Sequence, residues 1–241
     1  GGDVVAIAMQ NHRAFLVDVR ALSWIGATSS LVNTSLSGAG LRHAILQTSP
    51  KAIIASRELI EAIDAALSAD APLPRFFEET RPAVAAPPRD GTWQGLEALD
   101  DEPDDHGSHR SHIAERWYTT MHPARTLGGE LFAYIFTSGT TGRPKGGKIL
   151  NARAITGALG IGSFTVGFSE TDVMYICLPL FHASGLIVGA CSALHAGGTI
   201  ALARRFSVSR FWDDVSESGA TAFVYIGEIC RYLLASPPHP K

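Results

Sequence analysis

Short segments with the composition of strands alternate, over the first 70 residues, with longer segments in which apolar residues recur at helical spacing. The predicted strands are residues 4–9, 28–32 and 51–55. The predicted helices are residues 13–25, 39–47 and 58–67. Gly26 follows the first helix, at the place where a glycine often ends one. This alternation predicts βαβ units with largely parallel sheets, and therefore an α/β fold.

The alternation stops between residues 71 and 125. Seven of the thirteen prolines lie there, and six acidic residues lie between Glu97 and Asp105. This composition is typical of a connector or a surface excursion. His106, His109 and His112 have spacing that suits a metal site, but a solvated polar loop explains them equally well. We therefore assign no metal ligands.

The strand and helix alternation returns after residue 125. The predicted strands are residues 131–136, 173–177, 199–203 and 220–225. The predicted helices are residues 151–160, 186–195, 209–217 and 228–234, with Asn151 as an N-cap. We therefore expect an α/β subdomain over residues 1–70, a connector over 71–125 and a second α/β subdomain over 126–241.

Composition and charge exclude some classes of protein. With 46% hydrophobic residues the chain can bury a sizeable core, and its net charge of −3 argues against a nucleic-acid partner. Cys177, Cys191 and Cys230 are widely spaced and odd in number, which is typical of reduced thiols in the cytoplasm.

Residues 173–203 form an uncharged stretch longer than the roughly 20 residues that span a bilayer. Pro179, two histidines and the pair Gly197-Gly198 interrupt it, and it divides into strand, loop, helix and strand lengths. We interpret it as buried core. Peripheral contact with a membrane stays open as an alternative.

The segment from Tyr134 to Lys145 reads Tyr-Ile-Phe-Thr-Ser-Gly-Thr-Thr-Gly-Arg-Pro-Lys and carries the strongest chemical signal. It places hydroxyls, glycines and a lysine directly behind an apolar strand, a combination that suits binding of a polyphosphate. It matches neither the Walker loop nor the dinucleotide fingerprint. The candidate phosphate-binding residues are Thr137, Ser138, Gly139, Thr140, Thr141, Gly142 and Lys145.

This order of residues resembles the signature loop of the adenylate-forming (AMP-binding) enzymes, which include the acyl-CoA synthetases. A second segment, Leu178-Pro-Leu-Phe-His-Ala-Ser-Gly185, resembles another landmark of the same superfamily. Residues 31–36, 206–214 and 225–234 are similar to the branch of long-chain and very-long-chain acyl-CoA synthetases and fatty acid transport proteins. The resemblance implies the N-terminal part of that α/β fold.

The resemblance also implies a reaction and its participants. Members of this superfamily use ATP and Mg²⁺ to adenylate a carboxylic acid, and the acyl-CoA synthetases then transfer the acyl group to CoA. On that basis Lys145 and His182 are the candidate catalytic residues. His182 would meet the acid, and Tyr225 and Gly227 would line the acyl site, although a plain strand end explains these last two equally well. The expected substrate is a long-chain or very-long-chain fatty acid.

The superfamily places its nucleotide pocket, magnesium-binding glutamate and mobile lysine later in the chain than residue 241. We therefore expect this chain to be a fragment, incomplete at its C-terminus, and inactive in isolation. Gly146-Gly147 departs from the usual pair of small residues after the lysine, which we expect to loosen that turn.

Two other functions remain open. The first is adenylation of an aryl or amino acid, and the second is a non-catalytic lipid-binding module. A nucleophilic hydrolase is not supported, because neither G-x-S-x-G nor S-x-x-K occurs.

Overall fold

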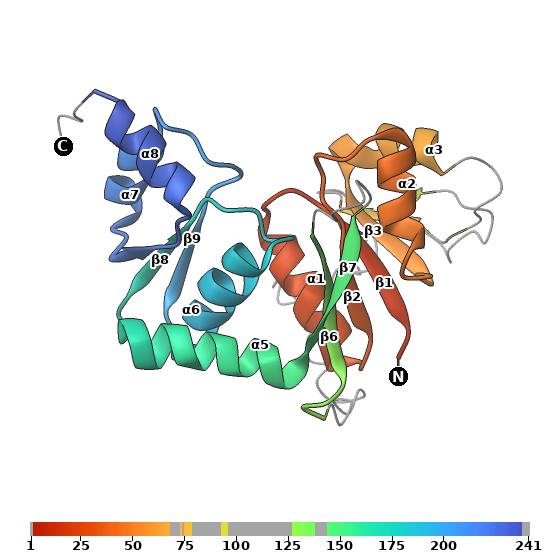
Figure 1. Ribbon diagram of the computed structural model, residues 1–241, viewed down its shortest axis with the longest axis horizontal. Helices are drawn as coiled ribbons and strands as arrows, with labels where there is room; N and C mark the ends of the chain where they lie inside the picture. Colours follow the sequence, from red (N-terminus) through yellow and green to blue (C-terminus); the bar gives the residue numbers. More distant parts are fainter. Residues whose placement is uncertain are drawn as a thin grey trace, which may run out of the picture. The chain divides into compact units, whose positions relative to one another are not determined.

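The chain forms an α/β fold with two compact units in a computed structural model (Figure 1). The structure describes residues 2–67, 73, 75–78, 93–95, 127–137 and 144–237, with the backbone alone at 75–78 and 93–95. The N-terminal unit consists of Gly1–Met9, Asp18–Thr126 and Leu131–Lys148. The C-terminal unit consists of Gln10–Val17, Leu127–Glu130 and Ile149–Lys241. Most of the expected connector lies outside the described residues.

The N-terminal unit is built on a seven-stranded sheet with the order β5-β4-β3-β1-β2-β6-β7. Its strands are β1 (Val4–Ala8), β2 (Thr28–Leu31), β3 (Ala52–Ser56), β4 (Arg75–Glu78), β5 (Trp93–Gly95), β6 (Leu131–Thr137) and β7 (Lys145–Leu150). Pairing is parallel from β5 through to β6, which confirms the predicted parallel sheet. The helices are α2 (Gly38–Leu46) and α3 (Ile60–Ala66), the last preceded by the short turn η1 (Arg57–Leu59). Helix α1 (Arg13–Trp24) contributes its residues from Asp18 onward to this unit, and its first residues belong to the C-terminal unit. Gly26 has the positive φ expected of a residue that ends a helix.

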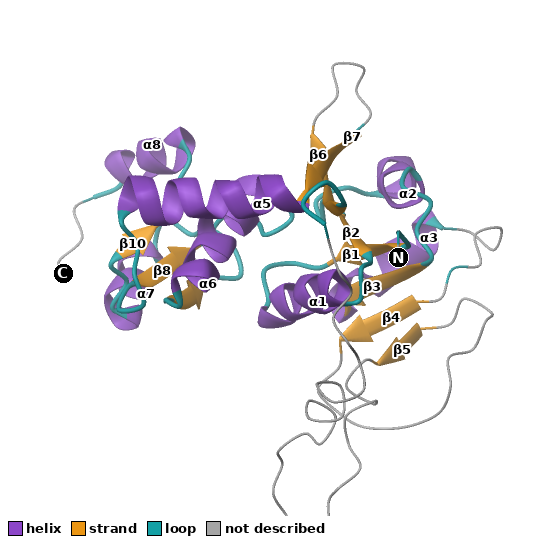
Figure 2. Ribbon diagram, turned by 90° about the horizontal axis from the view of Figure 1, so that it is seen from below, coloured by secondary structure: helices purple, strands orange, loops and turns teal. Residues whose placement is uncertain are grey.

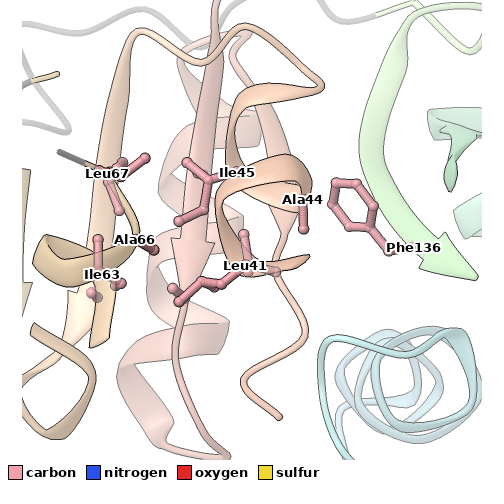
Figure 3. Close-up of a cluster of buried hydrophobic side chains, with 12 residues drawn as sticks. Leu41, Ala44, Ile45, Ile63, Ala66, Leu67 and Phe136 are labelled. Atoms are coloured by element: carbon pink, nitrogen blue, oxygen red, sulfur yellow. The ribbon is translucent and has the colours of Figure 1, made fainter. Parts of the chain in front are cut away.

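The core of this unit lies between the sheet and helices α2 and α3 (Figure 3). Leu41 and Ile45 of α2 pack in one cluster with Ile63 of α3 and with Phe136 of β6. Phe136 is buried, and it is the residue immediately before Thr137. The end of β6, where the candidate phosphate loop begins, is therefore anchored in the core.

The C-terminal unit is built on a three-stranded parallel sheet with the order β10-β8-β9. Its strands are β8 (Val173–Ile176), β9 (Thr199–Leu202) and β10 (Ala222–Phe223). The helices are α5 (Asn151–Ala158), α6 (Ser192–Ala196), α7 (Phe211–Ser218) and α8 (Gly227–Ala235). Two π-helical segments, η3 (Leu159–Val166) and η4 (Ser184–Cys191), continue α5 and precede α6.

The uncharged stretch forms the centre of this unit. It divides into β8, η4, α6 and β9, and Ile176, Leu180, Leu186 and Ala190 are fully or almost fully buried. The interpretation as buried core is therefore confirmed. In the part of the chain that the structure describes, no helix is both long and apolar enough to cross a bilayer.

Three local expectations differ from the structure. Asn151 is the first residue of α5 rather than its N-cap, and its Nδ2 donates to the carbonyl oxygens of Leu127 and Glu130, each at 3.3 Å. The strand predicted over residues 220–225 is shortened to β10. Strands β6 and β7 belong to the sheet of the N-terminal unit, because β6 pairs with β2, so the units do not follow the boundary expected near residue 126.

Candidate functional site

The two ends of the candidate phosphate loop lie on neighbouring strands of the N-terminal unit. Thr137 is the last residue of β6 and Lys145 is the first residue of β7, and the two strands lie side by side (Figure 2). Both side chains are exposed. Ser138, Gly139, Thr140, Thr141 and Gly142 lie outside the described residues.

The position of Thr137 follows from the way β6 is held. Ser29, Ser30 and Leu31 of β2 pair in parallel with Ala133, Tyr134 and Ile135 of β6. Thr137 therefore lies at the carboxyl end of a parallel strand, which is where α/β sheets usually bind their ligands. A hydroxyl and an ammonium group at this edge are suitable donors to phosphate oxygens.

Gly146 and Gly147 lie within β7, not in a turn. A Cβ at Gly147 would lie 3.2 Å from the carbonyl oxygen of Ile135, and one at Gly146 would lie 3.5 Å from the rings of Tyr134 and Phe136. The expectation that this pair loosens a turn is therefore wrong. The glycines allow β7 to run close against β6 directly after the candidate lysine.

An open pocket of about 580 Å³ lies beside the C-terminal end of the loop, within the same unit. Its walls are formed by one face of α2 and by Pro144, the residue before Lys145. Arg42 on this wall has a guanidinium that also donates to the carbonyl oxygen of Ala66 at 3.4 Å. The positive charge of Arg42 is compatible with an anionic ligand in this pocket.

His182 lies in the C-terminal unit, on the segment of residues 178–182 that follows β8 and that we call the histidine loop. The imidazole is half-buried, and its ring centroid lies 4.7 Å from that of Phe181. Burial lowers the pKa of His182 below its ordinary value, because a charged imidazole is disfavoured away from water. The side chain is therefore neutral at neutral pH, with one N–H to donate.

The glycine that closes the landmark segment has a steric role. A Cβ at Gly185 would overlap the carbonyl oxygen of Pro179 and would lie 2.9 Å from that of Leu178. The backbone amide of His182 also donates to the carbonyl oxygen of Pro179, at 3.1 Å. The start of η4 thus packs directly against the backbone of the histidine loop, and only glycine leaves enough room.

Tyr225 and Gly227 also lie in the C-terminal unit, just after β10. The Tyr225 side chain is 57% exposed, and its ring centroid lies 5.8 Å from that of Phe223. Gly227 begins α8 and has open space around it. They share a unit with His182, whereas Thr137 and Lys145 belong to the other unit.

Asn11 was not among the predicted site residues, yet its buried amide bonds to the backbone of the histidine loop. The available signal was a polar residue directly after the apolar run of the first strand. That signal is weak, because many strands end in a polar residue. The three long-range partners of Asn11 could not be identified without the fold.

The described residues contain no group of three or more histidine, cysteine, aspartate or glutamate side chains that could hold a metal ion. His106, His109 and His112 lie outside the described residues.

Comparisons with known proteins identify a family that matches the entire chain. The family described as AMP-binding enzyme matches residues 1–241. Mouse long-chain fatty acid transport protein 6 is 33% identical over 237 residues, which cover 98% of this chain and 35% of that protein. Medium/long-chain-fatty-acid–CoA ligase FadD6 of Mycobacterium tuberculosis is 32% identical over 245 residues, with 99% and 36% covered. The chain thus spans about a third of the length of these relatives.

Solved structures share the fold. The N-terminal domain of FACL13 from Mycobacterium tuberculosis superposes with a TM-score of 0.71 at 22% identity, covering 98% of this chain and 52% of that one. O-succinylbenzoate coenzyme A synthetase from Bacillus subtilis, in complex with ATP and magnesium ion, gives a TM-score of 0.70 at 19% identity, with 99% and 54% covered. At these identities the likeness supports the fold alone.

Proposed function

Because this chain belongs to the AMP-binding enzyme family, we propose that it contributes the phosphate-binding and acid-binding loops of an ATP-dependent long-chain or very-long-chain fatty acid–CoA ligase. The activity is proposed for the full-length protein, by which we mean this chain within a polypeptide of its relatives' length. The observation that carries the proposal is the placement of Thr137 and Lys145 at neighbouring strand ends, behind a core-anchored β6.

In the first proposed step a carboxylate oxygen of the fatty acid attacks the α-phosphorus of ATP, and the bond to the β-phosphate oxygen breaks. Pyrophosphate leaves with the negative charge. The Lys145 ammonium stabilises this leaving group, and Thr137 with the loop hydroxyls donates to its oxygens. Mg²⁺, when present, would supply further neutralisation of the phosphate charge. We assign no ligand of that ion to the described residues, which offer no cluster for it.

His182 acts on the acid in this proposal. Its neutral imidazole donates its N–H to the carboxylate and so orients the attacking oxygen, which raises the rate by positioning. The thiol of CoA then loses its proton to solvent and attacks the acyl carbon, the bond from that carbon to the phosphate oxygen breaks, and AMP leaves. Tyr225 and Gly227 line the path of the acyl chain, a role supported by the exposed apolar side chains Phe223, Tyr225 and Ile226 at the same strand end.

We propose a cytoplasmic location with peripheral contact to a membrane, because several similar proteins are named long-chain fatty acid transport proteins. The substrates are then ATP, CoA and a fatty acid that partitions into lipid.

A panel of carboxylic acids in an ATP–pyrophosphate exchange assay on the full-length protein tests the substrate. We expect exchange to depend on long-chain and very-long-chain fatty acids and to be weak with benzoate and amino acids. Faster exchange with an aryl or amino acid would replace the fatty acid as substrate while keeping adenylation.

A second assay separates the ligase from a lipid-binding module without catalysis. A fluorescent fatty acid and a fluorescent ATP analogue are titrated separately into the full-length protein. The proposal predicts binding of both. Binding of the fatty acid with no response to nucleotide would favour the lipid-binding module.

A further inference from the structure

Asn11 has a buried side-chain amide whose hydrogen bonds all reach backbone groups far away in the sequence. Only 7% of the residue is exposed. Its Nδ2 donates to the carbonyl oxygens of Leu178 and Ala203, both at 2.9 Å. Its Oδ1 accepts from the amide of Leu180 at 2.8 Å. All of these residues belong to the C-terminal unit.

These bonds fix the amide orientation and use both of its donors. Two carbonyl oxygens face Nδ2 and one backbone N–H faces Oδ1. The opposite amide orientation would place Oδ1 against the two carbonyl oxygens and Nδ2 against the N–H. A buried amide satisfied in this way rigidifies its surroundings, while each partner left unpaired in the interior is costly.

The three partners connect the sheet to the histidine loop. Leu178 lies just beyond β8, Ala203 just beyond β9, and the amide of Ala203 donates to the carbonyl oxygen of Ile176 at 2.9 Å. Asn11 therefore joins two strand ends and holds the loop at both sides of Pro179. The backbone N–H of His182 donates to the carbonyl oxygen of Pro179, so the position of Pro179 helps to set the backbone position from which the imidazole extends.

Gly185 supports the same part of the loop from η4. The start of η4 packs against the backbone of Leu178 and Pro179 so closely that a single methyl group would overlap it. The loop is thus held by the Asn11 amide and by the backbone at Gly185. Such double support is what a group needs if it must orient a substrate to within a fraction of an ångström.

We propose that Asn11 is a positioning residue, which sets the histidine loop so that His182 meets the carboxylate of the fatty acid. The inference rests on the proposed function of His182. Asn11 acts through backbone groups of the loop, and its loss moves the imidazole away from the acid and leaves the ATP-binding residues of the other unit in place.

The test compares Asn11→Asp with Gln10→Glu in the full-length protein. Asn11→Asp replaces the donor with an oxygen that faces two carbonyl oxygens, at the 2.9 Å spacing of the present bonds. Gln10→Glu makes the same chemical change one residue away, but the oxygen of Gln10 already accepts from Nε of Arg204 at 2.8 Å, so this interaction is kept. Asn11→Ser is the milder variant if Asn11→Asp does not fold.

We expect folded Asn11 variants to raise the KM for fatty acid, or lower the rate of adenylate formation, by about tenfold or more, since positioning is lost. The KM for ATP should stay within about twofold, because Thr137 and Lys145, which we propose bind the phosphates, lie in the N-terminal unit and are not changed. Modification of His182 by diethyl pyrocarbonate, followed by mass spectrometry, should become faster relative to the exposed His195. Gln10→Glu should change none of these values.

A folded Asn11→Ser protein with normal kinetics for fatty acid and unchanged reactivity of His182 would overturn the proposal. An equal loss for both substrates would also overturn it, because Asn11 would then be merely structural. The function proposed for His182 fails separately, if His182→Ala leaves the KM for fatty acid unchanged. The effect of Asn11 on the loop is then decided by the reactivity of His182 alone.

Discussion

Lys145, at the end of the candidate phosphate loop, and the histidine loop are held in different ways. Lys145 is exposed at the first position of a strand, and no hydrogen bond or ion pair of its ammonium is found within the described ranges. The histidine loop is bonded on both sides of Pro179 to the buried Asn11 and packs against Gly185. A substitution of Lys145 should therefore change the adenylation rate without changing the free energy of unfolding. A substitution in the histidine loop should change both.

The largest effect is expected from Gly185→Ala. The added methyl group meets the backbone of Pro179 and Leu178, which cannot move without disturbing the bonds to Asn11. We expect the free energy of unfolding of the C-terminal unit to fall by about 3 kcal/mol, at the upper end of overpacking costs. Denaturant unfolding measures this change, and adenylation should fall with it.

Gly227→Ala is the matched control, because a methyl group there meets no atom within 4 Å. It should leave stability unchanged within about 0.5 kcal/mol. If Gly185→Ala unfolded like Gly227→Ala, the close packing of the histidine loop would not contribute to stability, and the comparison of the two loops would fail.

Lys145→Ala is expected to act on the reaction alone. The rate of adenylation should fall tenfold or more, equivalent to about 1.4 kcal/mol, because the charge on departing pyrophosphate loses its partner. The melting temperature should not change, because an exposed lysine contributes little stability. Lys148→Ala removes an exposed lysine from the same strand and should leave both values unchanged. An unaltered exchange rate in Lys145→Ala would remove the role assigned to this residue.

A smaller, pH-dependent effect is expected at Asp172, which joins the starts of β8 and β10. Its carboxylate accepts hydrogen bonds from Ser169 and Thr221, and these lower its pKa below the ordinary value of 3.8. As the pH falls, Asp172 is therefore protonated in the unfolded state before it is protonated in the folded state. Its contribution to stability is present above pH 3.8 and is lost as the pH falls through the lower pKa of the folded state. Unfolding at a series of acidic pH values should show the loss, and Asp172→Asn should reduce it. An identical pH profile for the two proteins would contradict the assignment.

The smallest effect is expected at Cys177, beside the histidine loop. Burial raises the pKa of its thiol to about 11, so little thiolate forms at neutral pH. Iodoacetamide should therefore modify Cys177 much more slowly than the half-buried Cys230 in the folded protein, as followed by mass spectrometry. Equal rates would indicate that this part of the C-terminal unit opens readily.

The sequence alone was sufficient to predict the helices and strands whose pattern of apolar residues is contained within the element itself. The helices around Leu41, Ile63 and Phe211 were predicted to within a few residues, because their apolar spacing reflects the face that they bury. The order of the phosphate-loop and histidine segments was enough to identify the family, as the match over the entire chain confirms.

Contacts between distant residues could not be predicted. Asn151 has the composition of an N-cap, but its amide bonds to the turn before β6. Gly146 and Gly147 resemble turn glycines, yet they serve a close approach of two strands. Asn11 has partners more than 160 residues away. In each case the residue type was visible in the sequence, whereas its partner depended on the fold.

We propose that Lys145 acts on ATP and His182 on the acid. Both KM values and the exchange rate of the full-length Lys145→Ala and His182→Ala proteins test this division of roles. We expect a lower rate, or a weaker response to ATP, in Lys145→Ala at an unchanged KM for fatty acid. In His182→Ala we expect a KM for fatty acid raised by about tenfold, at an unchanged KM for ATP. A loss of the same size for both substrates in both variants would contradict the division of roles between the two loops.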